Sequence, residues 1–557
     1  MTPDDTMRPL PLYKAITLGL LCTALFTACT PKAEHPEQSN DTIESATSLT
    51  QDVSTEVLDD TATMGPKAPA NRTPAAAKIE HSADGQLTTI AIDYGNAKVG
   101  EYSAPARGFI IAPAQSDAPV PLIILSHLRA PNCADLESRY PCANGVDELR
   151  YDEGMRYAGE HLAKLGFAVV IPDLAPAFIG LDLKEPYDQT LFWQDIISRF
   201  VSSIERSNAH DEKLGFGIAP VDLTNIGLFV HSRSAQMTDT AERLFGKHLK
   251  SVLAYAPSYE TFELAEISPA PLDIPYLAVV GSRDTDVGAS ANLWLSHYTT
   301  TPRQAIASAV ELPHFGHMSI NRTAAKAGID DRRGCDMIAC QDDKAHEQMI
   351  LDVISDWFGA SLQGKNSTLP LTPHAPLPEH VADLPARWFA LSPKAIGYVD
   401  AKALSETALD KSTGVQYCAY SDPMNPAAAI MPACPEPEIG VVQILTPVAY
   451  IDHSAKATAA IKGASALALH IAPAGGAANA KGTSVDVALS LDNGETVSLS
   501  IPATHPALMD RASEYDSGSY RLGTVHLTLP QGIADRTINA ITISTDHPVL
   551  VRSVDFW

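Results

Sequence analysis

Three polar side chains of this sequence have the types and the order of a nucleophile, an acid and a base. Ser232 ends an apolar run of strand character and is followed by a helix-forming stretch. Asp284 comes shortly after the apolar stretch Tyr276–Gly281, and His317 comes shortly after Ala307–Leu312. A serine that gives its proton to a histidine, which a carboxylate orients, attacks esters and thioesters. Ser232, Asp284 and His317 are therefore candidates for such a triad.

The residues around Ser232 predict a sharp strand–turn–helix. In such a turn the serine hydroxyl is exposed, and the next backbone N–H points toward an oxyanion. The run resembles the G-H-S-R-G-G nucleophile elbow of α/β-hydrolases, lipases and dienelactone-hydrolase-like enzymes. It departs from that pattern at Val230 and Ser234, where the family has glycines that let the helix and strand pack closely. The resemblance covers roughly residues 90 to 360.

The resemblance also assigns the acid and the base. The four residues ending at Asp284 resemble the G-x-x-D turn of the family, with Asp286 as the alternative acid. The segment ending at His317 resembles the G-x-G-H loop, and His317 is preferred to His314 because it follows the glycine. The triad implied by the resemblance is Ser232, Asp284 and His317.

An oxyanion hole needs a second donor, which the family takes from the loop after its third strand. That loop contains His127, and aligning it with the family histidine makes the backbone N–H of Leu128 the donor, beside the N–H of Arg233. The side chains of Arg129 and Arg233 leave two interpretations open. They favour an anionic or polar substrate, or they are solvated surface groups.

Alternating strand and helix patterns predict an α/β fold, a mostly parallel sheet with flanking helices. The expected strands are 86–94, 107–112, 121–126, 167–172, 225–231, 250–255, 276–281 and 307–312. The expected helices are 148–165, 188–207, 235–245 and 345–358.

The C-terminal third has a different pattern. A Pro-rich linker at 363–385 separates the expected catalytic domain, 78–362, from a tail at 386–557 that alternates with period two. This alternation predicts that the tail is an all-β sandwich. It resembles the jelly-roll, galactose-binding-like modules of secreted hydrolases, which implies a glycan contact. The alternative is a module that covers an apolar face of the catalytic domain.

The N-terminus resembles a bacterial lipoprotein signal. Residues 15–26 form an apolar stretch too short to span a membrane, and small residues precede Cys29, which the resemblance makes the lipidated residue. Residues 1–29 are then the signal peptide, with Met7 as the start that leaves a positive n-region, and 30–77 a disordered tether. The alternative is an ordinary secretory peptide. The expected location is the cell envelope, in the periplasm or at the surface, attached to a membrane.

Six of the eight cysteines form pairs that are close in the sequence, which favours disulfides in an oxidising compartment. The expected pairs are Cys133 with Cys142, Cys335 with Cys340, and Cys418 with Cys434. The metal alternative lacks the CxxC spacings and histidines, and the acidic pairs at 330–331 and 342–343 follow no EF-hand pattern. We expect no metal and no cofactor.

The net charge of −26 repels phosphates, so a nucleic acid partner is not expected. Serine at the elbow excludes the dehalogenases and epoxide hydrolases, which have aspartate there, and no motif supports a peptidase. The sequence thus predicts an esterase acting on a small-molecule, lipid or polymeric ester. The rival hypothesis is a catalytically degenerate hydrolase fold kept as a binding or scaffold lipoprotein, with Val230 and Ser234 as signs of decay.

Overall fold

The computed structural model describes residues 65–557 except 181, 212–213, 261–266, 289, 330–334, 336–339, 407–413, 419–433, 435–446, 475–481 and 510–521. The expected signal peptide at 1–29, Cys29, the tether as far as residue 64 and the acidic pair at 330–331 lie outside the described residues.

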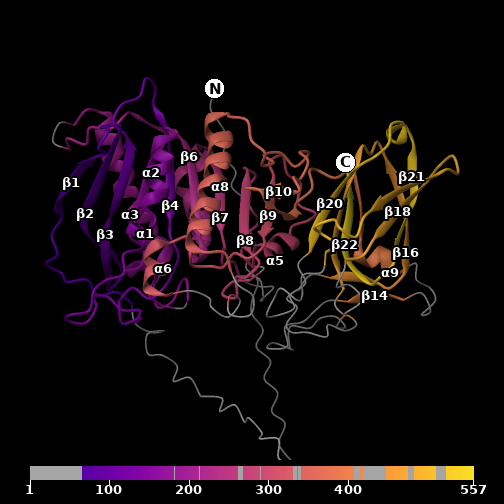
Figure 1. Cartoon of the computed structure of the whole chain (residues 1–557), viewed down its shortest axis with the longest axis horizontal. Coiled ribbons are helices and arrows are strands. Elements are labelled where there is room, and N and C mark those ends of the chain that lie inside the picture. Colours follow the sequence, from indigo (N-terminus) through magenta and orange to yellow (C-terminus); the bar gives the residue numbers. More distant parts are fainter. Residues whose placement is uncertain are drawn as a thin grey trace, which may run out of the picture. The chain divides into compact units, whose positions relative to one another are not determined.

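A ten-stranded sheet with helices against it forms the larger part of the described chain (Figure 1). Its strand order is β1-β2-β3-β5-β4-β6-β7-β8-β9-β12. In that order the strands are Ala75–His81, Leu87–Val99, Tyr102–Pro113, Ala168–Pro172, Val120–Ser126, Val221–His231, Leu249–Tyr255, Tyr276–Gly281, Ala307–Leu312 and Arg387–Ala390. The strands from β5 to β9 are parallel, and β1, β2, β3 and β12 are antiparallel to their neighbours. The α/β class expected from the sequence is confirmed.

The sequence order reverses at β4, which lies between β5 and β6. Open sheets of this kind bind ligands outside the carboxyl ends of their strands, at such a reversal. The residues following β4 and β6, including Leu128 and Ser232, lie at this position.

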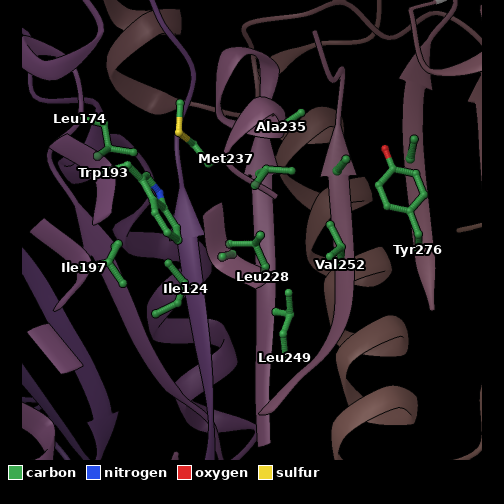
Figure 2. Close-up of a cluster of buried hydrophobic side chains, with 14 of the residues drawn as sticks. Ile124, Leu174, Trp193, Ile197, Leu228, Ala235, Met237, Leu249, Val252 and Tyr276 are labelled. Carbon is green, nitrogen blue, oxygen red and sulfur yellow. The ribbon is translucent and has the colours of Figure 1, made fainter. Parts of the chain in front are cut away.

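The sheet is buried on both faces because its strands are apolar at successive positions. One core contains α3 (Gln189–Asn208) and α4 (Thr238–Phe245), and the other contains α2 (Arg156–Lys164) and α8 (Asp343–Gln363). Figure 2 shows part of the first core, where Trp193 of α3 lies against Ile124 of β4 and Leu228 of β6. A short helix α1 (Tyr151–Gly154) precedes α2, within the single helix expected at 148–165.

The folded region begins before residue 78, where the sequence analysis placed it. Ala68 is buried, and its backbone N–H donates to the Ser103 carbonyl of β3 at 2.8 Å. Strand β1 begins at Ala75 and pairs with β2. Residues 65–77, expected in the tether, are therefore held by backbone hydrogen bonds, which composition does not reveal.

Strand β12 lies within the region assigned above to the C-terminal module, and it pairs with β9 at the end of the catalytic sheet. Trp388 and Phe389 of this strand are buried in the two cores of the sheet. The four-residue strand follows a Pro-rich stretch, so its pattern was too short to indicate which sheet it would join.

The described residues of the C-terminal region form two antiparallel sheets that share one hydrophobic core, as expected, together with a short helix, α9 (Ala401–Glu406), that the all-β prediction did not include. The first has β14 (Val415–Cys418), β15 (Val448–Ile451), β22 (Val549–Phe556), β17 (Ala466–Pro473) and β20 (Gly523–Thr528), with β13 (Gly397–Asp400) also pairing with β22. The second has β16 (Ser454–Lys462), β21 (Thr537–Thr545), β18 (Val485–Leu491) and β19 (Thr496–Ile501). Jelly-roll topology stays a prediction.

All three expected disulfides are present. Their Cα–Cα distances are 5.7 Å for Cys133–Cys142, 5.0 Å for Cys335–Cys340 and 4.9 Å for Cys418–Cys434. Asp342 of the acidic pair at 342–343 is the N-cap of α8 and accepts the Ala345 N–H. No helix within the described ranges has both the length and the apolar character needed to cross a membrane.

Candidate active site

Ser232 occupies a strained turn at the end of β6. Its φ is +57°, a left-handed value that non-glycine residues rarely adopt, and it begins a 3-10 helix, Ser232–Met237, that leads into α4. Strain of this kind persists where the surrounding structure fixes it, often at functional sites. The backbone N–H of Ser258 donates to the Ser232 carbonyl at 3.1 Å. This is the strand–turn–helix expected for a nucleophile elbow.

The two departures from the glycine pattern fit this turn. Val230 is fully buried in the core between the sheet and α3. Ser234 is also fully buried, and its hydroxyl donates to the backbone carbonyl of His127 in the loop after β4. The serine hydroxyl therefore connects the elbow to the loop that carries Leu128, a contact that glycine cannot make.

The loop after β4 is held beside the elbow. Ser126 is the register partner of Val230 in the adjacent parallel strand, so Leu128 and Ser232 follow at equivalent positions. Burial lowers the pKa of His127 to about 4, so this histidine is neutral. Its Nε2 accepts the Leu174 N–H at 2.9 Å, and its Nδ1 donates to the Leu128 carbonyl at 2.8 Å. These bonds orient the peptide groups around Leu128.

Asp284 and His317 are brought together by adjacent strands. Gly281 and Leu312, the last residues of β8 and β9, are register partners. His317 Nδ1 lies 2.9 Å from Asp284 Oδ2, and both side chains are fully buried. The other oxygen of Asp284 accepts the backbone N–H groups of Asp286 and Val287, each at 3.0 Å. The carboxylate is thus fixed in a position to orient the imidazole.

Close packing of the two loops explains the glycine before the acid. A Cβ on Gly281 would lie 2.2 Å from the Phe315 carbonyl oxygen, which accepts the Arg283 N–H at 2.8 Å. Two more side chains hold the backbone of Gly316, the residue before His317. The Tyr255 hydroxyl donates to the Gly316 carbonyl at 2.6 Å, and the Gly316 N–H donates to His346 Nε2 at 3.0 Å.

His231 is a positioning residue that the sequence reasoning did not single out. Its Nε2 donates to the His317 carbonyl at 3.0 Å, and the two imidazole rings lie 5.2 Å apart. Burial, reinforced by the neighbouring His317, holds the pKa of His231 well below its usual value, so it is a neutral donor. Because His231 directly precedes Ser232, this contact connects the backbone of His317 to the elbow. The histidine of the G-H-S pattern was the signal that could have found it.

Asp286 and His314, the alternatives for the acid and the base, occupy different positions from Asp284 and His317. Asp286, the alternative acid, has its Oδ2 at 3.4 Å from His317 Nε2, on the opposite edge of the ring from Asp284. His314 has φ of +65°, and its backbone N–H donates to the Ser282 hydroxyl at 2.9 Å. The geometry thus pairs His317 with Asp284.

A cavity of about 650 Å³ begins beside the elbow, lined by Arg233, Ala235 and Ser258. Its far wall includes Tyr259 and Trp294, whose rings stack with centroids 4.0 Å apart. Burial, with a contribution from Arg129, lowers the pKa of Arg233 to about 10, so its guanidinium stays charged at neutral pH.

Arg129 extends from the loop after β4, and its Nε donates to the Gly180 carbonyl at 2.8 Å. Across the part of the chain that the structure describes, no three histidine, cysteine or acidic side chains gather in a way that could hold a metal ion.

Comparison with known proteins gives structural similarity alone. Neither the family models nor the curated protein sequences include a match to this chain. Among solved structures, an S-formylglutathione hydrolase from Agrobacterium tumefaciens is 12% identical, with 44% of this chain and 92% of that chain covered and a TM-score of 0.29. A dienelactone hydrolase from Anabaena variabilis is 16% identical, with 52% and 100% covered and a TM-score of 0.26. A CE1 ferulic acid esterase from the fungus Anaeromyces mucronatus is 16% identical, with 48% and 92% covered and a TM-score of 0.28.

Proposed function

We propose that this protein is an exported serine hydrolase that cleaves carboxylic esters through an acyl-enzyme on Ser232. The observation that supports this most directly is that one parallel sheet carries a strained, positive-φ serine after β6 and a buried histidine–aspartate hydrogen bond after β8 and β9. Triads of this kind are defined by geometry and roles, not by sequence position. The alternative scaffold function has less support, because Val230 is buried in the core and Ser234 makes a hydrogen bond to the loop after β4.

In acylation, Ser232 Oγ attacks the ester carbonyl while His317 Nε2 takes its proton. Asp284 holds the imidazole so that Nδ1–H points at the carboxylate and stabilises the imidazolium that forms. The carbonyl oxygen becomes an oxyanion, which the backbone N–H groups of Leu128 and Arg233 receive. Preorganised donors of this type supply a large part of the rate enhancement in acyl transfer. His317 then protonates the leaving alcohol.

The cavity beside the elbow suits a small-molecule ester. Its volume of about 650 Å³ lies within the usual range of ligand pockets, and its stacked aromatic wall offers apolar contact area. The partly buried, charged guanidinium of Arg233 in the cavity wall favours the first of the two interpretations given above, a polar or anionic substrate. A lipid or polymeric ester would need only its scissile group to enter this cavity.

We also propose that the chain is attached to the cell-envelope membrane through a lipid on Cys29. The short apolar stretch and the small residues before this cysteine support the proposal. Cys29→Ser should prevent incorporation of labelled palmitate and release the protein from the detergent phase. Equal labelling of the variant would refute the attachment.

A fluorophosphonate probe tests the catalytic proposal directly, because it reacts with an activated serine and needs no knowledge of the substrate. The full chain should be labelled at Ser232, as mapped by peptide mass spectrometry, and Ser232→Ala should not be labelled. A correctly folded wild-type protein that does not react would favour the scaffold function.

A further inference from the structure

A second carboxylate reaches the reactive edge of His317. Asp286 Oδ2 lies 3.4 Å from His317 Nε2, the nitrogen that exchanges protons in the proposed mechanism. The Asp286 N–H donates to Asp284 Oδ1 at 3.0 Å, so the turn that fixes the acid also fixes the backbone of Asp286. The Asp286 side chain is 49% exposed, whereas Asp284 is fully buried. The triad does not use this second carboxylate.

The charge of Asp286 also acts on two arginines, Arg129 and Arg233. Burial lowers the pKa of both Arg129 and Arg233, and the negative charge of Asp286 opposes that effect at each of them. Arg129 follows Leu128, and Arg233 follows Ser232. The Asp286 carboxylate is thus half exposed, contacts the base and influences the charge of the residues that follow the proposed oxyanion donor Leu128 and the nucleophile.

This position coincides with the place of the hydrolytic water. Once Ser232 is acylated, a water must contact His317 Nε2 to give up its proton. A water at hydrogen-bond distance from Nε2 is also within reach of a carboxylate oxygen 3.4 Å from the same nitrogen. The second O–H of this water can then donate to the Asp286 carboxylate, which fixes the orientation of the water.

We propose that Asp286 orients the water that hydrolyses the acyl-enzyme, an inference that rests on the proposed esterase function. The water oxygen bonds to the acyl carbon, and one water proton moves to His317 Nε2. The bond between Ser232 Oγ and the acyl carbon then breaks, Ser232 recovers that proton, and the carboxylic acid leaves. The second O–H of the water donates to Asp286, and no proton is transferred to that carboxylate.

Methanol provides a direct test because it has a single O–H. With p-nitrophenyl acetate in water–methanol mixtures, the acyl-enzyme partitions between acetate and methyl acetate, whichever step limits turnover. In Asp286→Ala the ratio of acetate to methyl acetate should fall about tenfold, the effect of losing one hydrogen bond to a charged acceptor. Asp286→Asn keeps an acceptor oxygen and should restore part of the ratio. The exposed Asp117→Ala removes the same charge elsewhere and should leave the ratio unchanged.

The rate of fluorophosphonate labelling separates this role from others, because phosphonylation of Ser232 uses no water. Asp286→Ala should be labelled within twofold of the wild-type rate. An unchanged product ratio would overturn the inference, and so would a large loss of labelling, which would make Asp286 part of serine activation. If the wild type formed no methyl acetate and was not labelled, the esterase function itself would fail.

Discussion

The described residues include two buried clusters of serine, histidine and aspartate, and we propose a catalytic role for one of them. The elbow cluster is Ser232, His317 and Asp284. The joint cluster is Ser392, His470 and Asp555, where His470 belongs to β17, Asp555 to β22, and Ser392 follows β12. In the joint cluster His470 Nε2 lies 3.0 Å from Asp555 Oδ2 and 3.5 Å from the Ser392 hydroxyl.

The two clusters differ in what each edge of the imidazole faces. In the elbow cluster Asp284 binds Nδ1, and Nε2 faces the Asp286 carboxylate at 3.4 Å. In the joint cluster the Thr524 hydroxyl lies 2.9 Å from Nδ1, while aspartate and serine share Nε2. Residue types alone therefore do not define a triad. In the elbow cluster the serine has a strained backbone and the imidazole binds its carboxylate through Nδ1, and neither is true of the joint cluster.

The largest expected effect comes from replacing each histidine by glutamine. His317→Gln removes the general base and should lower kcat for p-nitrophenyl esters by about 10⁴-fold or more. His470→Gln can still donate to Asp555 and lies in no proposed catalytic contact, so kcat should stay within about twofold. Stopped-flow and steady-state kinetics on both variants measure this. Equal losses would show that the distinction drawn between the clusters is wrong.

Stability should show the reverse pattern. His470→Ala leaves the buried Asp555 carboxylate without its main partner, which costs about 3 to 5 kcal/mol in comparable buried pairs. The Ala390 N–H of β12 donates to the Thr524 hydroxyl at 3.0 Å, so the loss should extend to the end of the catalytic sheet. Chemical denaturation followed by circular dichroism gives the change. A shift below 1 kcal/mol would show that the joint cluster contributes little to the fold.

These contrasts show which features the sequence could reveal. Local patterns in the sequence predicted the three candidate triad residues, the parallel strands and the three disulfides. The structure brings two of the triad residues, Asp284 and His317, into contact. The resemblance preferred Asp284 but left Asp286 as an alternative, because both follow the same strand and only the turn decides which carboxylate faces Nδ1. The joint cluster could not be predicted from the sequence, because its residues are 78 or more positions apart and no motif connects them.

The joint cluster should also make the protein sensitive to acid. Burial alone would raise the pKa of Asp555, but His470 and the hydroxyls of Ser392 and Ser553 outweigh burial and hold it below its usual value. A carboxyl with a lowered folded pKa stabilises the fold above its unfolded pKa of about 4, and that contribution is lost as the pH falls through the folded value. The difference in melting temperature between wild type and Asp555→Asn should therefore be constant above about pH 5 and shrink below pH 4. A constant difference down to pH 3 would contradict this.

The smallest expected effect tests the connection between the elbow and the loop that carries Leu128. Ser234→Gly restores the residue of the family pattern and removes the hydrogen bond from Ser234 to the His127 carbonyl. A neutral hydrogen bond contributes about 0.5 to 1.5 kcal/mol, so kcat should fall about two- to tenfold, while KM changes little because the contact serves the oxyanion donor. Ser392→Ala is the matched control in the joint cluster, since it removes a buried serine hydroxyl away from the reacting atoms. Its kcat should equal that of wild type. If Ser234→Gly instead raised kcat, glycine would be the better elbow residue, and Ser234 would mark a partial loss of catalytic geometry.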